Sequence, residues 1–179
     1  VDTGDIIIKE LVNISNTDNI ESLKNKLSVL SSKLIINLLD LIEENLNNIS
    51  DISSLLTRQE SKPIKPTYAR LINKDDFLID WFATGEQIIN KIRGLYPNAY
   101  TICKDKRLKI IKLEKFIDPS YVYKNNSGEI IDIIKNKGIL VSNKQYPLLI
   151  TEAQLEGKKP SSNNILIQQT KLIKGDKFI

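Results

Sequence analysis

The sequence predicts an α+β chain in two parts, in which a strand and a long helix are followed by a small antiparallel β-barrel. Three observations support this fold class. An isoleucine run at 6–8 precedes a leucine-rich stretch with helical spacing. A polar segment is then closed by Pro63 and Pro66. In the rest of the chain, short apolar runs alternate with turn residues, as in small all-β domains.

The first part begins with a predicted turn and strand over residues 2–12, and its isoleucine run is typical of a strand covered on both faces. Asp18 and Glu21 have the spacing of a capping box at the start of a helix. The apolar residues of that helix recur every three or four positions, at Leu23, Leu27, Leu30, Leu34, Leu38 and Leu41. Val29, Ile35, Ile36 and Leu39 widen the face, so we expect it to pack on a sheet.

The second part follows a predicted linker, residues 49–66, which divides the chain into parts 1–48 and 67–179. Residues 67–72 and 77–81 are expected to be extended, and 84–97 to contain one short helix. Strands are expected at 99–103, 107–116, 129–134, 138–142 and 147–154, and a last helix at 161–173, capped by Ser161 or Ser162. About five short antiparallel strands with one inserted helix predict a closed barrel of the OB type.

The composition excludes several kinds of chemistry. There is no histidine, so this sequence supplies no histidine base and no histidine metal ligand. The one cysteine, Cys103, rules out an intrachain disulfide and favours a reducing, cytoplasmic compartment. We expect it to be a buried small hydrophobic residue. We expect no metal site, and no stretch is long and apolar enough to suggest a membrane span.

Charge is divided unevenly along the chain. Residues 1–60 carry 5 Lys and Arg against 10 Asp and Glu, a net charge of −5. The remainder carries 21 basic against 12 acidic residues, a net charge of +9. A basic half of this kind is the part to test for binding to nucleic acid.

The first residues look like the middle of a longer chain. The sequence has no methionine, and Asp2 lies in an Asp-Thr-Gly turn directly before the isoleucine run. From pattern alone, this aspartate is a turn former. Because a turn and a strand begin at once, we expect the chain to be a fragment of a protein with a further upstream part.

Six segments together resemble the methionyl-tRNA formyltransferase family: DTGDI, PTYARLINKDD, IDW, IINKIRGLYPNAYT, RLKI and AQLEGKKP. Each is weak alone, and their order and spacing make the set specific. The resemblance covers essentially the whole chain. It implies that the first part is the end of a doubly wound α/β catalytic domain, and that the second part is the tRNA-binding barrel domain.

The resemblance also implies a reaction and a catalytic set. The family transfers a formyl group from 10-formyltetrahydrofolate to the amino group of methionyl initiator tRNA. Its catalytic set contains Asn, His and Asp, and Asp2 matches the aspartate. A carboxylate next to a histidine orients that ring and favours its charged form. The Asn and His of the set are absent from this sequence, so we expect this chain to be inactive alone.

A protein that binds a tRNA stem needs Lys and Arg on one surface, because the stem carries closely spaced phosphates. The candidates are Lys62, Lys65, Arg70, Arg93, Lys158 and Lys159. The RLKIIKLEK segment adds further basic residues, and strand alternation predicts Lys109 and Lys115 on one face with Lys112 on the other. Taken singly, each of these residues fits an ordinary solvated surface.

Two alternatives stay open. The chain could be part of another folate-dependent formyltransferase, one that acts on sugar nucleotides or resembles a hydrolase. It could also be a non-catalytic RNA-binding module. A monomer is expected in each case.

Overall fold

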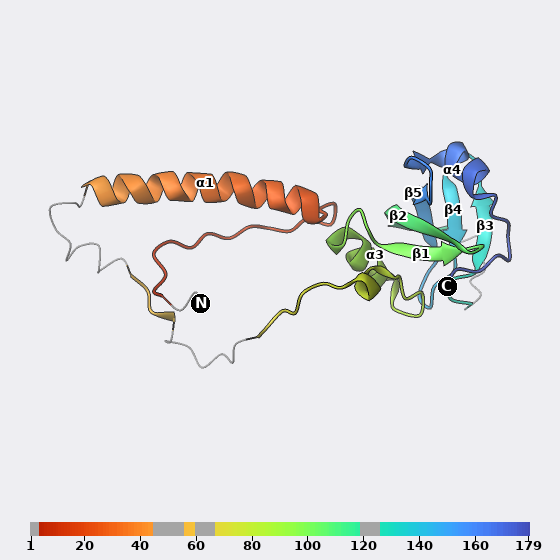
Figure 1. The fold of residues 1–179 in the computed structure, drawn as a ribbon, viewed down its shortest axis with the longest axis horizontal. Coiled ribbons are helices and arrows are strands. Elements are labelled where there is room, and N and C mark those ends of the chain that lie inside the picture. The colour runs from red at the N-terminus through yellow and green to blue at the C-terminus, as the bar shows by residue number, and fades with distance from the viewer. Residues whose placement is uncertain (1–3, 45–55, 60–66, 119–125) are drawn as a thin grey trace. The chain divides into compact units, whose positions relative to one another are not determined.

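A computed structural model of the chain describes residues 4–44, 56–59, 67–118 and 126–179 (Figure 1). The chain divides into two compact units, Val1–Leu71 and Ile72–Ile179, here called unit 1 and unit 2. Most of the predicted linker, and with it Lys62 and Lys65, lies outside the described residues, as does Asp2.

Unit 1 contains one long helix, α1 (Ile20–Glu44), which confirms the helix predicted from the leucine spacing. None of its residues is buried. Its wide apolar face includes Leu27, Val29, Ile35, Ile36 and Leu39, each of them 44–58% exposed. No described part of unit 1 is a sheet on which this face could pack.

The strand predicted over residues 2–12 is wrong within its described part. Ile6 forms only an isolated antiparallel bridge with Thr57, and Ile6 and Ile7 are each 38% exposed. A strand needs neighbours on its edges to become part of a sheet, and Thr57 is the only partner in the described part of unit 1. The doubly wound sheet expected for this part is likewise not among the described elements.

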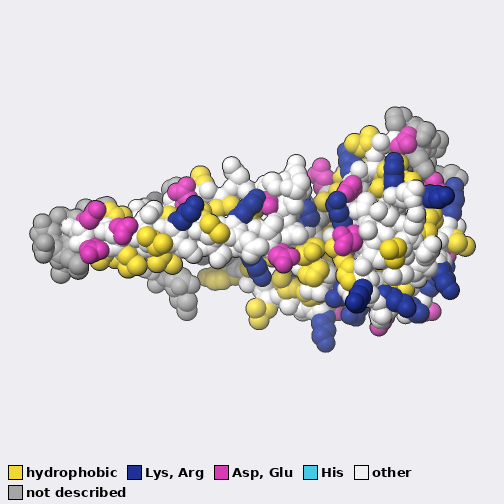
Figure 2. Space-filling view, turned by 90° about the horizontal axis from the view of Figure 1, so that it is seen from above, with side chains coloured by type: hydrophobic (Ala, Val, Ile, Leu, Met, Phe, Trp, Pro, Cys, Tyr) yellow, Lys and Arg dark blue, Asp and Glu magenta, His cyan; other side chains and the backbone are white. Residues whose placement is uncertain are grey.

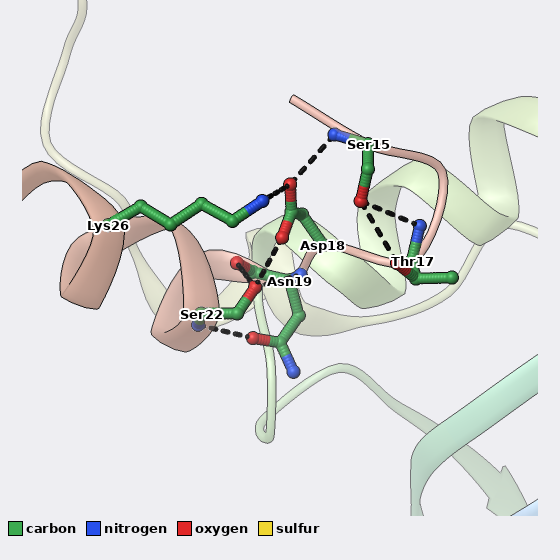
Figure 3. Close-up of polar contacts among 6 residues, drawn as sticks. All are labelled: Ser15, Thr17, Asp18, Asn19, Ser22 and Lys26. Carbon is green, nitrogen blue, oxygen red and sulfur yellow. Dashed lines mark hydrogen bonds and ion pairs between the residues drawn. The ribbon is translucent and has the colours of Figure 1, made fainter. Parts of the chain in front are cut away.

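The capping box at the start of α1 is displaced by one residue from the predicted pair. Asn19 Oδ1 accepts a hydrogen bond from Ser22 N at 2.9 Å, and Ser22 Oγ accepts one from Asn19 N at 3.1 Å. Asp18 instead accepts from Ser15 N, Ser22 Oγ and Lys26 Nζ (Figure 3). The serine hydroxyl takes the role expected of Glu21, because Asn19 is the residue directly before the helix.

Unit 2 combines short helices with an antiparallel sheet. Its elements are η2 (Lys74–Phe77), α3 (Gly85–Gly94), β1 (Tyr100–Cys103), β2 (Lys106–Lys115), β3 (Ile130–Ile134), β4 (Gly138–Val141), β5 (Leu148–Leu155), β6 (Ser161–Ser162) and α4 (Asn163–Thr170). The five main strands and α3 confirm the predicted elements. The last predicted helix is confirmed only over Asn163–Thr170, because Ser161 and Ser162 form β6, and Ser162 stands at the N-cap position without a side-chain hydrogen bond. Thr84 and Gln87 form the capping box of α3, which buries Ile88 and Ile92.

The six-stranded sheet has the order β1-β2-β5-β4-β3, with β6 paired to β5. The two edge strands, β1 and β3, do not pair with each other, so the predicted closed barrel is wrong in this respect: the sheet is open. The segment after α4 bridges the gap between the two edges. Asp176 O accepts from Ile130 N at 2.8 Å on β3, and Ile179 N donates to Ile102 O at 3.1 Å on β1.

The core of unit 2 lies inside this curved sheet and extends to α3 and α4. Trp81 is 3% exposed and stacks on Phe178 with ring centroids 5.2 Å apart, so it anchors this core. Its indole N–H donates to Thr101 Oγ1 at 3.0 Å. Buried Asn143 donates to the carbonyls of Trp81 and Ala83. The β4–β5 loop therefore holds the chain that leads into α3.

Candidate nucleic-acid interface

Positive charge gathers around a cavity of unit 2 at the tip of the β1–β2 hairpin. A pocket of about 600 Å³ is lined there by four lysines, Lys104, Lys106, Lys158 and Lys171. We call it the lysine pocket. Its other lining residues are Cys103, Leu108, Leu155, Gln168, Gln169, Thr170 and Leu172. All four lysines are exposed, and the lining includes no carboxylate.

Local geometry brings these lysines from three segments to one place. Lys104 and Asp105 have φ of 48° and 60°, as a two-residue hairpin turn requires, so Lys104 lies in the tip and Lys106 begins β2 directly after it. The β5–β6 turn, which carries Lys158, is tied to β2 because Glu156 N donates to Arg107 O and Arg107 N donates to the Glu156 carboxylate. Lys171 caps the C-terminal end of α4 in the left-handed conformation.

Lys104 differs from the other three lysines because it is already paired. Its Nζ lies 2.8 Å from Asp176 Oδ2 and donates to Lys171 O at 2.9 Å. The hydrogen bond from Lys104, joined by one from Ile173 N, lowers the pKa of Asp176. This arrangement neutralises the nearby carboxylate and ties the hairpin tip to the chain after α4. Among the described residues, the ammonium groups of Lys106, Lys158 and Lys171 form no ion pair.

Cys103 lines the lysine pocket but is almost fully buried. It is 6% exposed, and burial, followed by the charge of Asp176, raises the pKa of its thiol to about 11. A thiol with such a pKa is almost fully protonated at neutral pH and is a poor nucleophile. Cys103 is therefore a buried small hydrophobic residue, as its position in a strand predicted.

The structure places the predicted basic residues in separate surroundings. Lys158 lines the lysine pocket, and Lys159 follows it in the same exposed turn. Arg93 lies on the last turn of α3, where its guanidinium donates to Asn90 Oδ1. Arg70 belongs to unit 1 and donates to Leu71 O at 2.9 Å. Within unit 2, the structure therefore brings only Lys158 of the predicted set into the pocket.

Sequence reasoning missed Lys104, Lys106 and Lys171 as members of one site. A signal existed for the first two, since Lys104, Asp105 and Lys106 lie between the strands predicted at 99–103 and 107–116. Lys171 carries no local signal, because its approach to Lys104 depends on how α4 packs on β4 and β5. Figure 2 shows Lys and Arg side chains around much of the visible face of unit 2.

The predicted faces of the β2 lysines are wrong. The pairing of β2 with β5 shifts register around Lys112, so that Ile110 pairs with Ala153 and Lys112 with Glu152. This bulge reverses the side-chain alternation, because one residue is inserted in the ladder. Lys109 and Lys112 therefore lie on the outer face, and Lys115 lies over the ring of Tyr146 at 4.3 Å.

A second pocket of unit 2, of about 690 Å³, has a different character. Its lining includes apolar groups of Trp81, Phe82 and Phe178, and also Asp75, Asp80 and Lys177. Two carboxylates near one ammonium group disfavour a phosphate there. Of the two pockets, the lysine pocket is the one whose charge fits a nucleic acid.

The described residues contain neither a metal-binding cluster nor a helix that could span a membrane. They include no group of three or more His, Cys, Asp or Glu side chains placed to hold a metal ion. Within the same part of the chain, no helix combines the length and the apolar character that crossing a bilayer requires.

The family model and the individual relatives that match the chain both point to formyltransferases. Residues 71–170 match the family described as "Formyl transferase, C-terminal domain". Methionyl-tRNA formyltransferases of Prochlorococcus marinus strains MIT 9515 and MED4 are 40% and 42% identical to the chain over 99% of its length. The enzyme of Synechococcus sp. strain CC9605 is 33% identical over the same share.

The chain spans 56–57% of the length of these relatives. The family match covers most of unit 2, including three of the four lysines of the pocket. The chain therefore belongs to the formyl transferase C-terminal domain family.

Proposed function

We infer that this chain is the C-terminal portion of a methionyl-tRNA formyltransferase and that its share of the function is to bind tRNA. The observation that carries this proposal is the identity of about 40% to proteins of that name over 99% of the chain. The net charge of +9 after residue 60 and the lysine pocket support it, because tRNA is a polyanion.

In this proposal, the whole protein transfers a formyl group from 10-formyltetrahydrofolate to methionyl initiator tRNA in the cytoplasm, at the start of translation. Asp2 is the one residue of the chain that we assign to the catalytic set. The histidine of that set must come from another part of the protein, since this sequence has none. The chain alone is then an inactive, monomeric piece that binds tRNA.

The tRNA-binding residues proposed from the sequence are Lys62, Lys65, Arg70, Arg93, Lys158 and Lys159. The open β-sheet of unit 2 is OB-like in this proposal, and the C-terminal segment bridges its edge strands β1 and β3 by hydrogen bonds without closing the barrel. Unit 1 would be the end of the doubly wound catalytic domain. The exposed apolar face of α1 supports this assignment, because such a face needs a covering sheet.

The test is binding of the chain to initiator tRNA across a salt series. Glutamine replaces Lys62, Lys65, Lys158 and Lys159 in one variant, and Lys24, Lys33, Lys135 and Lys137 in a control variant with the same charge loss. We expect affinity of the original chain to fall steeply with salt, and the first variant to show a slope smaller by about 2–4, at roughly 0.9 per lost contact. The control should keep the original slope.

The same assay separates the alternatives. A chain from a sugar-nucleotide formyltransferase would bind no tRNA at low salt and would bind a sugar nucleotide instead. An unrelated RNA-binding module would bind tRNA, but the whole protein from which the chain comes would not formylate methionyl-tRNA. Either result would overturn the proposal.

A further inference from the structure

We propose that the lysine pocket holds a backbone phosphate of the bound RNA, with Lys106, Lys158 and Lys171 as its ligands. This inference rests on the proposed function and makes it specific. Three ammonium groups from three distant segments line one concave site whose lining includes no carboxylate. Like charges gathered in this way repel one another until an anion lies between them.

Lys104 has a positioning role in this site. Its ammonium group is shared between Asp176 and Lys171 O, at 2.8 and 2.9 Å. These contacts join the hairpin tip to the C-terminal end of α4, and they also cancel the charge of Asp176, a nearby carboxylate that would repel an anion. Lys104 therefore shapes the pocket, while the other three lysines remain available to bind.

Neutral hydrogen-bond donors in the pocket lining complement the positive charge of the lysines. Ser161 Oγ and Gln169 Oε1 lie 3.0 Å apart in a hydrogen bond. This bond uses the amide oxygen of Gln169, so its amide nitrogen, which only donates, can serve an anion. Gln168, also in the lining, is exposed. The volume of about 600 Å³ lies in the range of sites for small organic ligands, so a phosphodiester can enter with part of its sugar.

The residue types also indicate that the pocket does not distinguish one base sequence of the RNA from another. A lysine acts on phosphate as a point charge, without the fixed two-pronged geometry of arginine. Phosphate contacts position a nucleic acid and carry no sequence information. The pocket should therefore strengthen binding equally for initiator and elongator tRNAs, and selection of the initiator must lie elsewhere in the whole protein.

The experiment compares two triple variants of the full 179-residue chain. The pocket variant carries Lys106→Gln, Lys158→Gln and Lys171→Gln. The control variant carries Lys135→Gln, Lys137→Gln and Lys144→Gln, which removes the same charge from exposed lysines outside the pocket lining. Circular dichroism confirms that each variant is folded, and affinity for initiator and elongator tRNA is measured from low to high salt.

We expect the slope of log affinity against log salt to be smaller by about 2–3 in the pocket variant. Its affinity at moderate salt should fall roughly 10- to 100-fold. Both losses should be the same for the two tRNAs. The control should lose less than about threefold. Equal losses in the two variants would show that only net charge matters, and no loss in the pocket variant would show that the pocket is not used. Either result overturns the inference.

A second measurement separates this inference from the proposed function. Inorganic phosphate is titrated into the isotopically labelled chain, and backbone amide shifts are followed by NMR. Saturable shifts centred on Lys106, Lys158 and Lys171 are expected, while Lys135 and Lys137 stay unchanged. If the chain binds no tRNA, the proposed function and the RNA part of the inference both fail, and phosphate shifts then decide whether an anion site exists. If tRNA binds but phosphate shifts are absent or spread evenly, only the pocket inference fails.

Discussion

Asp18 shows how one carboxylate can organise the start of a helix without being its cap. It accepts hydrogen bonds from Ser15 N at 2.7 Å, Ser22 Oγ at 2.9 Å and Lys26 Nζ at 2.6 Å. The contact with Lys26 is the largest cause that holds the pKa of Asp18 well below its usual range, followed by the backbone donor of Ser15. All these contacts stabilise the charged form of the carboxyl group.

Because the folded-state pKa of Asp18 is lowered, its contribution to the stability of α1 is present above the ordinary value of about 4 and declines as pH falls below it. We expect ¹³C NMR titration of the Asp18 carboxyl to give a midpoint clearly below that value. Lys26→Gln should move the midpoint upward, whereas Lys24→Gln, on the same helix, should leave it in place. A midpoint near 4 in the original chain would contradict the geometry.

In unit 2, the turns and bulges determine where the strands begin and end more closely than the strand patterns do. Gly138 begins β4 with φ of 154°, and a Cβ placed on it would lie 2.0 Å from Ile150 O and 3.0 Å from Ile150 C. Both atoms belong to the backbone of β5, which pairs with β4. Only glycine allows the two strands to approach so closely.

Gly138→Ala should therefore reduce the free energy of unfolding of unit 2 by about 3 kcal/mol, since backbone must move. Gly157→Ala is the matched control, because Gly157 also has positive φ, 75°, but has open space around its Cβ position. It should cost about 1 kcal/mol, the backbone term alone. Urea denaturation of both variants measures the difference. Equal losses would show that the close approach does not matter.

The segment after α4 is an element of the core as well as a bridge between sheet edges. Phe178 is 3% exposed and stacks on Trp81, while Ile179 O accepts from Thr101 Oγ1 at 2.9 Å. The same threonine oxygen accepts the tryptophan N–H. The last residues therefore complete both the packing and the hydrogen bonding of a buried cluster.

Phe178→Ala should lower the free energy of unfolding by about 3–4 kcal/mol, through lost burial and the cavity left behind. It should also speed amide exchange at Ile102 and Ile130, whose N–H groups donate to the C-terminal segment. Ile173→Ala, at a site in the same segment that is 63% exposed, should change stability by less than about 0.5 kcal/mol. A comparable loss in both variants would argue that the segment is not part of the core.

At the scale of the whole molecule, the hydrophobic core is concentrated in one part of the chain, as the positive charge is. Every residue of the main hydrophobic cluster lies between Ile79 and Phe178, inside unit 2. Unit 1, in its described part, buries no residue of α1. The two units therefore differ in how much apolar burial supports them.

A chain limited to residues 72–179 should fold by itself and unfold in one cooperative transition. We expect its Tm to agree within about 3 °C with the main transition of the full chain, because removing residues 1–71 takes nothing from the cluster. Differential scanning calorimetry makes the comparison. A lower Tm by much more than this would show that unit 1 contributes to the core of unit 2.

Local patterns in the sequence were sufficient to predict α1, α3, α4 and the five main strands, because helix spacing, capping residues and turn residues act between near neighbours. They also included Lys158 among the basic candidates, and Lys158 lines the lysine pocket. The burial predicted for the isoleucine run at 6–8 failed because burial depends on partner strands, which the described part of unit 1 does not contain.

Tertiary structure alone decided the rest. The bulge in β2 reversed the faces of its lysines, and the C-terminal segment, rather than a strand pair, connected the sheet edges. The lysine pocket exists because packing of α4 brings Lys171 to Lys104, 67 positions away. The physical reason is common to all three: pairing, register and charge clustering are long-range contacts, and a sequence pattern reports only the short-range preferences of the residues that make them.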